Sequence, residues 1–154
     1  MKMLVSWVES PRNFLVILGA PGMGKTYLCA ALYDWFRSKY SSSIRYYNER
    51  QLLREVRNSI EESKGDYLTT LKYKCDDQVF LFDDLGSSGS NEWRREVLFD
   101  FLDLRYEHQL PTVITSNLTR DEIKKDYGQR FLSRLCAKEN TIIEMHGAAD
   151  KRQE

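Results

Sequence analysis

Short, continuous apolar runs alternate along this chain with longer segments in which apolar residues recur every three or four positions. Runs of the first kind are typical of buried β-strands, and the second spacing is typical of amphipathic helices. Because the runs are apolar at consecutive positions, we expect strands covered on both faces, as in a parallel sheet between helices. Five strands are predicted, at residues 14–18, 44–47, 79–82, 112–115 and 141–145.

Helical spacing fills the segments between the strands. The third predicted helix follows Ser90 or Asn91, either of which is a favourable N-cap. The fourth opens with Thr119 and Glu122, which have the spacing of a capping box, and Gly128 divides it into two helices. Helices are therefore expected over about residues 24–40, 49–74, 91–106 and 119–135.

The length and charge of the chain limit its organisation. With 154 residues it has the size of one domain, and we predict a single domain over residues 1–154, with a short helix within residues 1–12 and a core over residues 13–147. Lys and Arg number 23, as do Asp and Glu, so the formal net charge is zero. Any contact with nucleic acid therefore has to come from a local patch rather than from an overall positive field.

The cysteines and histidines form no recognisable site. Cys29, Cys75 and Cys136 are odd in number and far apart, which argues against a disulfide framework and a zinc site and favours a reducing, cytoplasmic location. His108 and His146 stand apart from each other and from acidic pairs at ligand spacing, so we expect structural or surface roles for them. No apolar run approaches the roughly 20 residues of a membrane helix, and no membrane partner is expected.

The segment after the first predicted strand has the pattern GxxxxGK[ST]. Between a strand and a helix this pattern forms a phosphate-binding loop, because its glycines let backbone N–H groups surround phosphate oxygens at the positive end of the helix dipole. Lys25 should reach the β and γ phosphates, and Thr26 should offer a hydroxyl to Mg²⁺. The predicted nucleotide ligands are Gly19, Ala20, Pro21, Gly22, Met23, Gly24, Lys25 and Thr26.

Two carboxylates follow the third predicted strand, at Asp83 and Asp84. The carboxyl edge of a parallel sheet is where α/β proteins bind ligands. Asp83 is therefore predicted to hold Mg²⁺, directly or through water, and Asp84 to act as the general base that polarises the attacking water. An Asp pair after a strand is, by itself, more often a turn or a helix cap; its coincidence with the phosphate-binding loop favours catalysis.

Further polar residues follow the fourth predicted strand. Asn117 lies at the same expected edge, where its amide would contact the γ-phosphate or the lytic water; the alternative is a turn-forming asparagine. Arg130 and Arg134 lie four residues apart and so share one helix face. Exposed arginines are commonly only solvated, but we hypothesise that Arg130 is a finger inserted into the ATP site of a neighbouring subunit.

These elements together resemble the AAA+ ATPases, and specifically the DnaC/DnaI helicase loaders and the IstB transposition helpers. The resemblance covers about residues 14–147. The segments that carry it are Asp83-Asp-Leu-Gly, Trp93-Arg-Arg-Glu-Val-Leu-Phe, Leu104-Arg-Tyr, Thr115-Ser-Asn-Leu and Arg130-Phe-Leu-Ser-Arg-Leu.

The resemblance implies a three-layer P-loop NTPase fold of the AAA+ type, with a five-stranded parallel sheet and with ATP and Mg²⁺ as cofactors. It implies that Asn117 is the first nucleotide sensor, that Arg130 is the intersubunit finger, and that Arg134 is a second interface arginine that contacts nucleotide. Two departures from the family are expected: about 13 residues precede the first strand, where loaders carry a helicase-binding domain, and no C-terminal helical lid follows the last strand. The pocket should then be open on one side.

The expected function is that of an ATPase, slow as a monomer, that loads a replicative helicase in DNA replication. It would assemble head to tail with ATP and bind single-stranded DNA. Lys64, Lys72, Lys74 and the aromatic residues Tyr67 and Tyr73 are candidates for the contact, and the alternative for the lysines, which stand among several acids, is a solvated face. A transposition helper, whose partner is a transposase, would share every catalytic residue. A small P-loop kinase and a module that holds ATP as a structural ligand are the alternatives from other classes.

Overall fold

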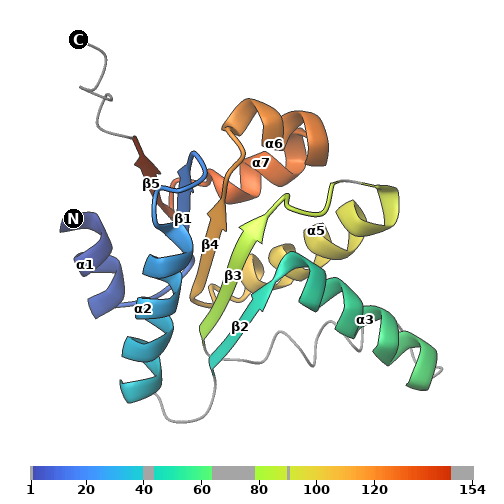
Figure 1. The fold of residues 1–154 in the computed structure, drawn as a ribbon, viewed down its shortest axis with the longest axis horizontal. Helices are drawn as coiled ribbons and strands as arrows, with labels where there is room; N and C mark the ends of the chain where they lie inside the picture. Colours follow the sequence, from blue (N-terminus) through green and yellow to red (C-terminus); the bar gives the residue numbers. More distant parts are fainter. Residues whose placement is uncertain (1, 40–43, 64–78, 90, 147–154) are drawn as a thin grey trace.

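A computed structural model describes residues 2–39, 44–63, 79–89 and 91–146 of the chain. These residues form one parallel sheet of five strands with helices on both faces (Figure 1). The strands are β1 (Phe14–Gly19), β2 (Ile44–Asn48), β3 (Val79–Leu85), β4 (Thr112–Ser116) and β5 (Thr141–Met145). The helices are α1 (Lys2–Glu9), α2 (Lys25–Lys39), α3 (Glu49–Ser63), α5 (Glu92–Glu107), α6 (Arg120–Tyr127) and α7 (Gln129–Leu135).

The strand order, β2-β3-β4-β1-β5, decides which loops meet at the carboxyl edge of the sheet. β4 lies between β1 and β3, and its last residue, Ser116, is in register with Leu18 of β1 and with Leu85 of β3. β2 ends at the same level, because Asn48 is in register with Asp83. The loops that follow β1, β3 and β4 therefore emerge side by side.

Alternate residues of the buried strands supply two separate cores. On one face, Phe14, Val16 and Leu18 of β1 pack in a cluster with buried residues of α3, α5, α6 and α7. On the other face, Leu15 and Ile17 pack with residues of α1 and α2, among them Trp7 and Phe36. The molecule is thus a three-layer sandwich, and the predicted α/β fold of the P-loop NTPase type is confirmed.

The predicted elements match the observed ones with one correction. We expected all five strands to be covered on both faces, but β2 and β5 are the edges of the sheet and most of their residues are only half-buried. The caps are confirmed: the side chain of Asn91 accepts a hydrogen bond from the backbone N–H of Arg94, and Thr119 and Glu122 form both arms of a capping box. Residues 64–74 of the helix predicted over 49–74 lie outside the described residues, and with them all the candidates for the DNA contact named above.

Candidate nucleotide-binding site

The loop between β1 and α2 has the backbone shape that its glycines allow. Gly22 and Gly24 have φ values of +80° and +83°, in the left-handed region that side chains disfavour. α2 begins at Lys25, so its unpaired N–H groups face the loop. The Lys25 ammonium donates hydrogen bonds to the carbonyl oxygens of Gly19 (2.5 Å) and Ala20 (2.7 Å), which hold it within the loop. Its burial lowers the pKa of Lys25, although the nearby Asp84 and Asp83 oppose that effect.

Asp83 is buried at the end of β3, with 5% of its surface exposed, and three hydroxyl groups from three elements surround it. Tyr46 of β2 donates to Oδ2 at 2.8 Å. Thr115 of β4 and Thr26 of α2 donate to Oδ1, at 2.5 and 3.4 Å respectively. These donors fix the carboxylate beside the Thr26 hydroxyl. Because Mg²⁺ prefers oxygen ligands and commonly takes only one or two carboxylates from the protein, Asp83 and Thr26 suit it as ligands.

Asp84 is turned by a local irregularity in β3. The register between β3 and β4 shifts between Phe82 and Leu85, and Asp84 adopts a left-handed φ of +63°, which Asp tolerates better than most residues. Its backbone N–H donates to the Thr115 hydroxyl at 2.9 Å. Its carboxylate accepts a hydrogen bond from the Asn117 side-chain amide, also at 2.9 Å. The irregularity therefore separates the two neighbouring carboxylates and directs Asp84 toward Asn117.

Two contributors to this site, Tyr46 and Thr115, have no role that the sequence predicted. Burial and the bond to Asp83 raise the pKa of Tyr46, so its phenol remains protonated and acts as a donor. Thr115 is a hydroxyl residue next to the carboxyl end of a fully buried strand, which is the signal that would have indicated a role for it. No comparable signal exists for Tyr46, because its contact depends on β2 lying beside β3.

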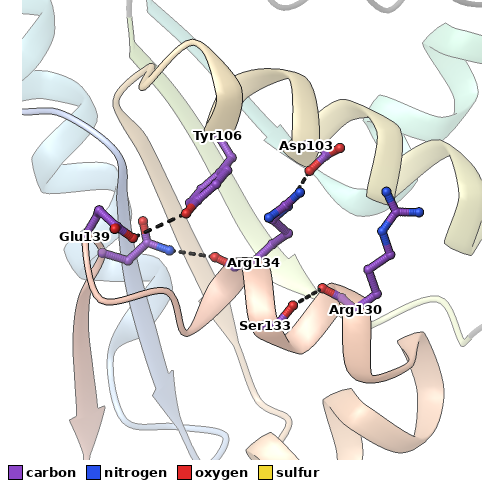
Figure 2. Close-up of polar contacts among 7 residues, drawn as sticks. Asp103, Tyr106, Arg130, Ser133, Arg134 and Glu139 are labelled. Atoms are coloured by element: carbon purple, nitrogen blue, oxygen red, sulfur yellow. Dashed lines mark hydrogen bonds and ion pairs between the residues drawn. The ribbon is translucent and has the colours of Figure 1, made fainter.

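Arg130 and Arg134 lie elsewhere: both project from α7 toward α5 (Figure 2). The Arg130 guanidinium carbon is 4.4 Å from the centre of the Phe99 ring. Arg134 forms an ion pair with Asp103, which raises the pKa of Arg134, and lies 4.9 Å from the centre of the Tyr106 ring. The structure thus brings Asp83 to Thr26 and Asp84 to Asn117 at one edge of the sheet, whereas the side chains of both arginines contact α5.

A cavity of about 680 Å³ adjoins the phosphate-binding loop. Its walls come from the loop itself, from the residues that join β4 to α6, and from the end of β5. An ion pair of 2.7 Å between Arg120 and Glu144 ties the last two walls together. The volume lies within the range of small-molecule sites, so there is room for a ligand beside the loop.

Comparison with known proteins agrees with this geometry. The model of the family "IstB-like ATP binding protein" matches residues 2–138. The chain belongs to this IstB-like ATP-binding family. It is also 36% identical over 124 residues to the replicative helicase loader DnaI of Bacillus subtilis, and 30% identical over 115 residues to the chromosomal replication initiator DnaA of Geotalea daltonii. These matches cover 75% and 74% of this chain but only 37% and 24% of the relatives.

Solved structures show the same fold. The DnaC helicase loader superimposes over 94% of this chain and 86% of its own, with a TM-score of 0.74 and 22% identity. DnaI does so over 94% and 82%, with a TM-score of 0.70 and 26% identity. The initiator DnaA bound to AMPPCP and single-stranded DNA superimposes over 96% of this chain and 45% of its own, with a TM-score of 0.80 and 15% identity. The resemblance to helicase loaders and IstB-like proteins is therefore confirmed.

The cysteines and histidines were expected to lie outside any site, and of these His146 lines the cavity beside the phosphate-binding loop. Cys29 is buried and Cys136 half-buried, and both are free thiols. His146 is largely exposed and lies 3.9 Å from Glu144. Within the described ranges, no three His, Cys, Asp or Glu side chains are grouped to hold a metal ion, and no helix is both long and apolar enough to cross a membrane.

Proposed function

We propose that this IstB-like protein binds and hydrolyses Mg²⁺-ATP and acts in DNA replication by loading a replicative helicase. The observation that carries the ATPase part is the convergence of the phosphate-binding loop, Asp83, Asp84 and Asn117 at one edge of the sheet. The loader part rests on the relation to DnaI.

In this proposal each residue of the site has one task. Lys25 and the N–H groups of the loop bind the phosphates, and Asp83 with Thr26 would hold Mg²⁺, which neutralises phosphate charge when bound. Asp84 accepts the proton of the attacking water. Asn117 holds Asp84 at 2.9 Å and keeps that carboxylate aimed at the nucleotide side of the edge.

Complete activity would need a second subunit. The Arg130 guanidinium contacts α5 rather than the loop of its own subunit, which is compatible with a role in a neighbour's site. We therefore propose head-to-tail assembly with ATP, in which Arg130 stabilises the charge of the transferring phosphate. Fingers of this kind contribute about 10³ to 10⁵ in rate, so the isolated monomer should be slow.

A cluster of arginines on α3 and α5 supports contact with single-stranded DNA. Arg50, Arg54 and Arg57 recur on one face of α3, and with Arg94 and Trp93 of α5 they line a small pocket of about 160 Å³ that has no acidic lining residue. The Arg57 guanidinium lies 4.9 Å from the centre of the Trp93 ring. Positive charge next to an aromatic ring suits a phosphate backbone with a stacked base.

The nucleotide site is tested by Lys25→Ala, with binding of a fluorescent ATP analogue as the measurement. We expect binding to be lost while the thermal unfolding midpoint changes little, because the hydrogen bonds that Lys25 donates go to carbonyl oxygens of its own loop. Unchanged affinity would contradict the assignment of the loop. For the partner, the chain with ATP is offered to a purified replicative helicase and to a transposase; capture of the transposase alone would replace the loader role by that of a transposition helper.

The arginine cluster is tested by the salt dependence of oligonucleotide binding. The double variant Arg54→Gln and Arg57→Gln should bind a single-stranded oligonucleotide more weakly, and the slope of log K against log salt should fall by about 1.4, which is about 0.7 for each phosphate that is no longer neutralised. Arg37→Gln is the matched control, because α2 covers the opposite face of the sheet. Equal effects of the double variant and the control would exclude the cluster as the contact.

A further inference from the structure

We propose that Phe99 and Asp103 of α5 are positioning residues that set the direction in which the subunit presents Arg130 to its neighbour. This inference rests on the proposed function, because it assumes that Arg130 acts in trans. It assigns a role to two residues of the donor subunit that would affect hydrolysis only in the active site of the neighbouring subunit.

Three residues on one face of α5 contact the two arginines of α7. Phe99, Asp103 and Tyr106 follow one another at intervals of four and three, so they share one face of α5. Arg130 and Arg134 share one face of α7. Arg130 lies over Phe99, the first member of the α5 row. Arg134 contacts the other two members, Asp103 and Tyr106 (Figure 2).

Arg134 is held by an ion pair and Arg130 by an aromatic ring, and this difference suits different roles for the two arginines. The Asp103 carboxylate forms an ion pair with Arg134, and only 17% of the Asp103 side chain is exposed. Arg130 instead lies 4.4 Å from the centre of the Phe99 ring. The Phe99 ring carries no net charge, so this contact adds no negative charge beside the guanidinium. Phe99 thus contacts Arg130 without offsetting its positive charge, and this suits an arginine whose proposed role is to bind the transferring phosphate of a neighbouring subunit.

α7 depends on such contacts because it is short and poorly capped. It has seven residues, and Gly128 at its N-cap gives no side-chain hydrogen bond. Its buried residues, Phe131 and Leu135, hold one face against the core, and the Asn140 amide donates to carbonyl oxygens at its C-terminal end. These contacts fix the depth and one end of the helix. The pair between Arg134 and Asp103 lies on its flank and so resists rotation about the helix axis, which is the motion that would redirect Arg130.

The test uses mixtures of variant full-length chains. Arg130→Ala chains can bind ATP but lack the finger, and Lys25→Ala chains cannot bind ATP but keep the finger. Each alone should be inactive, and their mixture should regain at least about tenfold in ATP turnover if the finger acts in trans. The positioning residues are then changed only in the Lys25→Ala donor, to Phe99→Leu or Asp103→Asn, with the exposed Glu96→Gln as the matched control.

We expect both donor changes to lower the recovered kcat between about 3-fold and 100-fold, with the KM for ATP unchanged, since the acceptor's site is intact. The control donor should match the parent donor, and Asp103→Glu should restore part of the loss. Recovery that is the same with all donors would overturn the positioning role while leaving the finger in place. No recovery with the parent donor would overturn the proposed finger itself, and this inference with it.

Discussion

Replacing Thr115 by valine should lower the free energy of unfolding, because it removes hydrogen bonds between β4 and the part of β3 that carries Asp83 and Asp84. The Thr115 side chain has 1% of its surface exposed, and its hydroxyl makes two hydrogen bonds. It donates to the Asp83 carboxylate and accepts from the backbone N–H of Asp84. Valine has nearly the same shape, so the substitution removes these bonds without opening a cavity.

The magnitude follows from the two bonds. A hydrogen bond to a charged group contributes about 1.5–3 kcal/mol, and one between neutral groups about 0.5–1.5 kcal/mol. Tyr46 still donates to Asp83, so the carboxylate keeps a partner, whereas the N–H of Asp84 is deprived of its acceptor at 2.9 Å. We therefore expect Thr115→Val to lower the free energy of unfolding by about 2–4 kcal/mol.

Urea unfolding followed by circular dichroism measures this decrease, with an unchanged m-value as the check that only stability has changed. Thr115→Ser is the control, since it keeps the hydroxyl and removes one methyl group, which costs about 1 kcal/mol. If valine destabilises the protein no more than serine does, the two hydrogen bonds contribute nothing and the reasoning is refuted. ATP turnover of Thr115→Val should also fall, because the hydroxyl that holds the Asp84 backbone is absent.

Three further results are expected. Asp84→Asn should bind ATP as the parent does but stop its hydrolysis, as measured by phosphate release; a variant with full turnover would exclude Asp84 as the base. Burial raises the pKa of Glu49 in the folded protein, so the unfolded chain releases that proton at lower pH, and the free energy of unfolding should fall as pH rises above about 4.5. Glu49→Gln should flatten this fall, as measured by urea titrations at several pH values. The glutamine can still accept the hydrogen bonds from the Gly86 N–H and the Tyr127 hydroxyl. Phe101→Ala, at a side chain with 0% exposure, should cost about 3–5 kcal/mol of unfolding free energy, and a decrease below about 1 kcal/mol would contradict its place in the core.

Much of the fold and the centre of the site were predictable because they depend on local chemistry. The apolar runs and the helical spacing located every described strand and most helices to within a few residues. The phosphate-binding loop is a contiguous segment whose backbone shape follows from its own glycines, Gly22 and Gly24. The cap at Asn91 and the capping box at Thr119 likewise use partners only three residues away.

Other features depend on contacts between distant segments. Arg105 is an example: it is charged, yet it has 0% exposure, because its guanidinium donates to the Thr112 hydroxyl and the Pro111 carbonyl oxygen at 2.8 Å each. The role of Tyr46 follows from β2 lying beside β3, and the turn of Asp84 follows from a register shift against β4.

The sequence by itself therefore determined the chemistry that this protein has available: a phosphate-binding loop, two carboxylates and an asparagine near the carboxyl ends of predictable strands, and a pair of arginines on a predictable helix. Only the tertiary structure decided how these groups are used. It placed three hydroxyls around Asp83, joined Asp84 to Asn117, paired Arg134 with Asp103 and placed Arg130 over the Phe99 ring. The physical reason is that hydrogen bonds and ion pairs need contact within a few ångströms, and strand order and register bring distant residues that close.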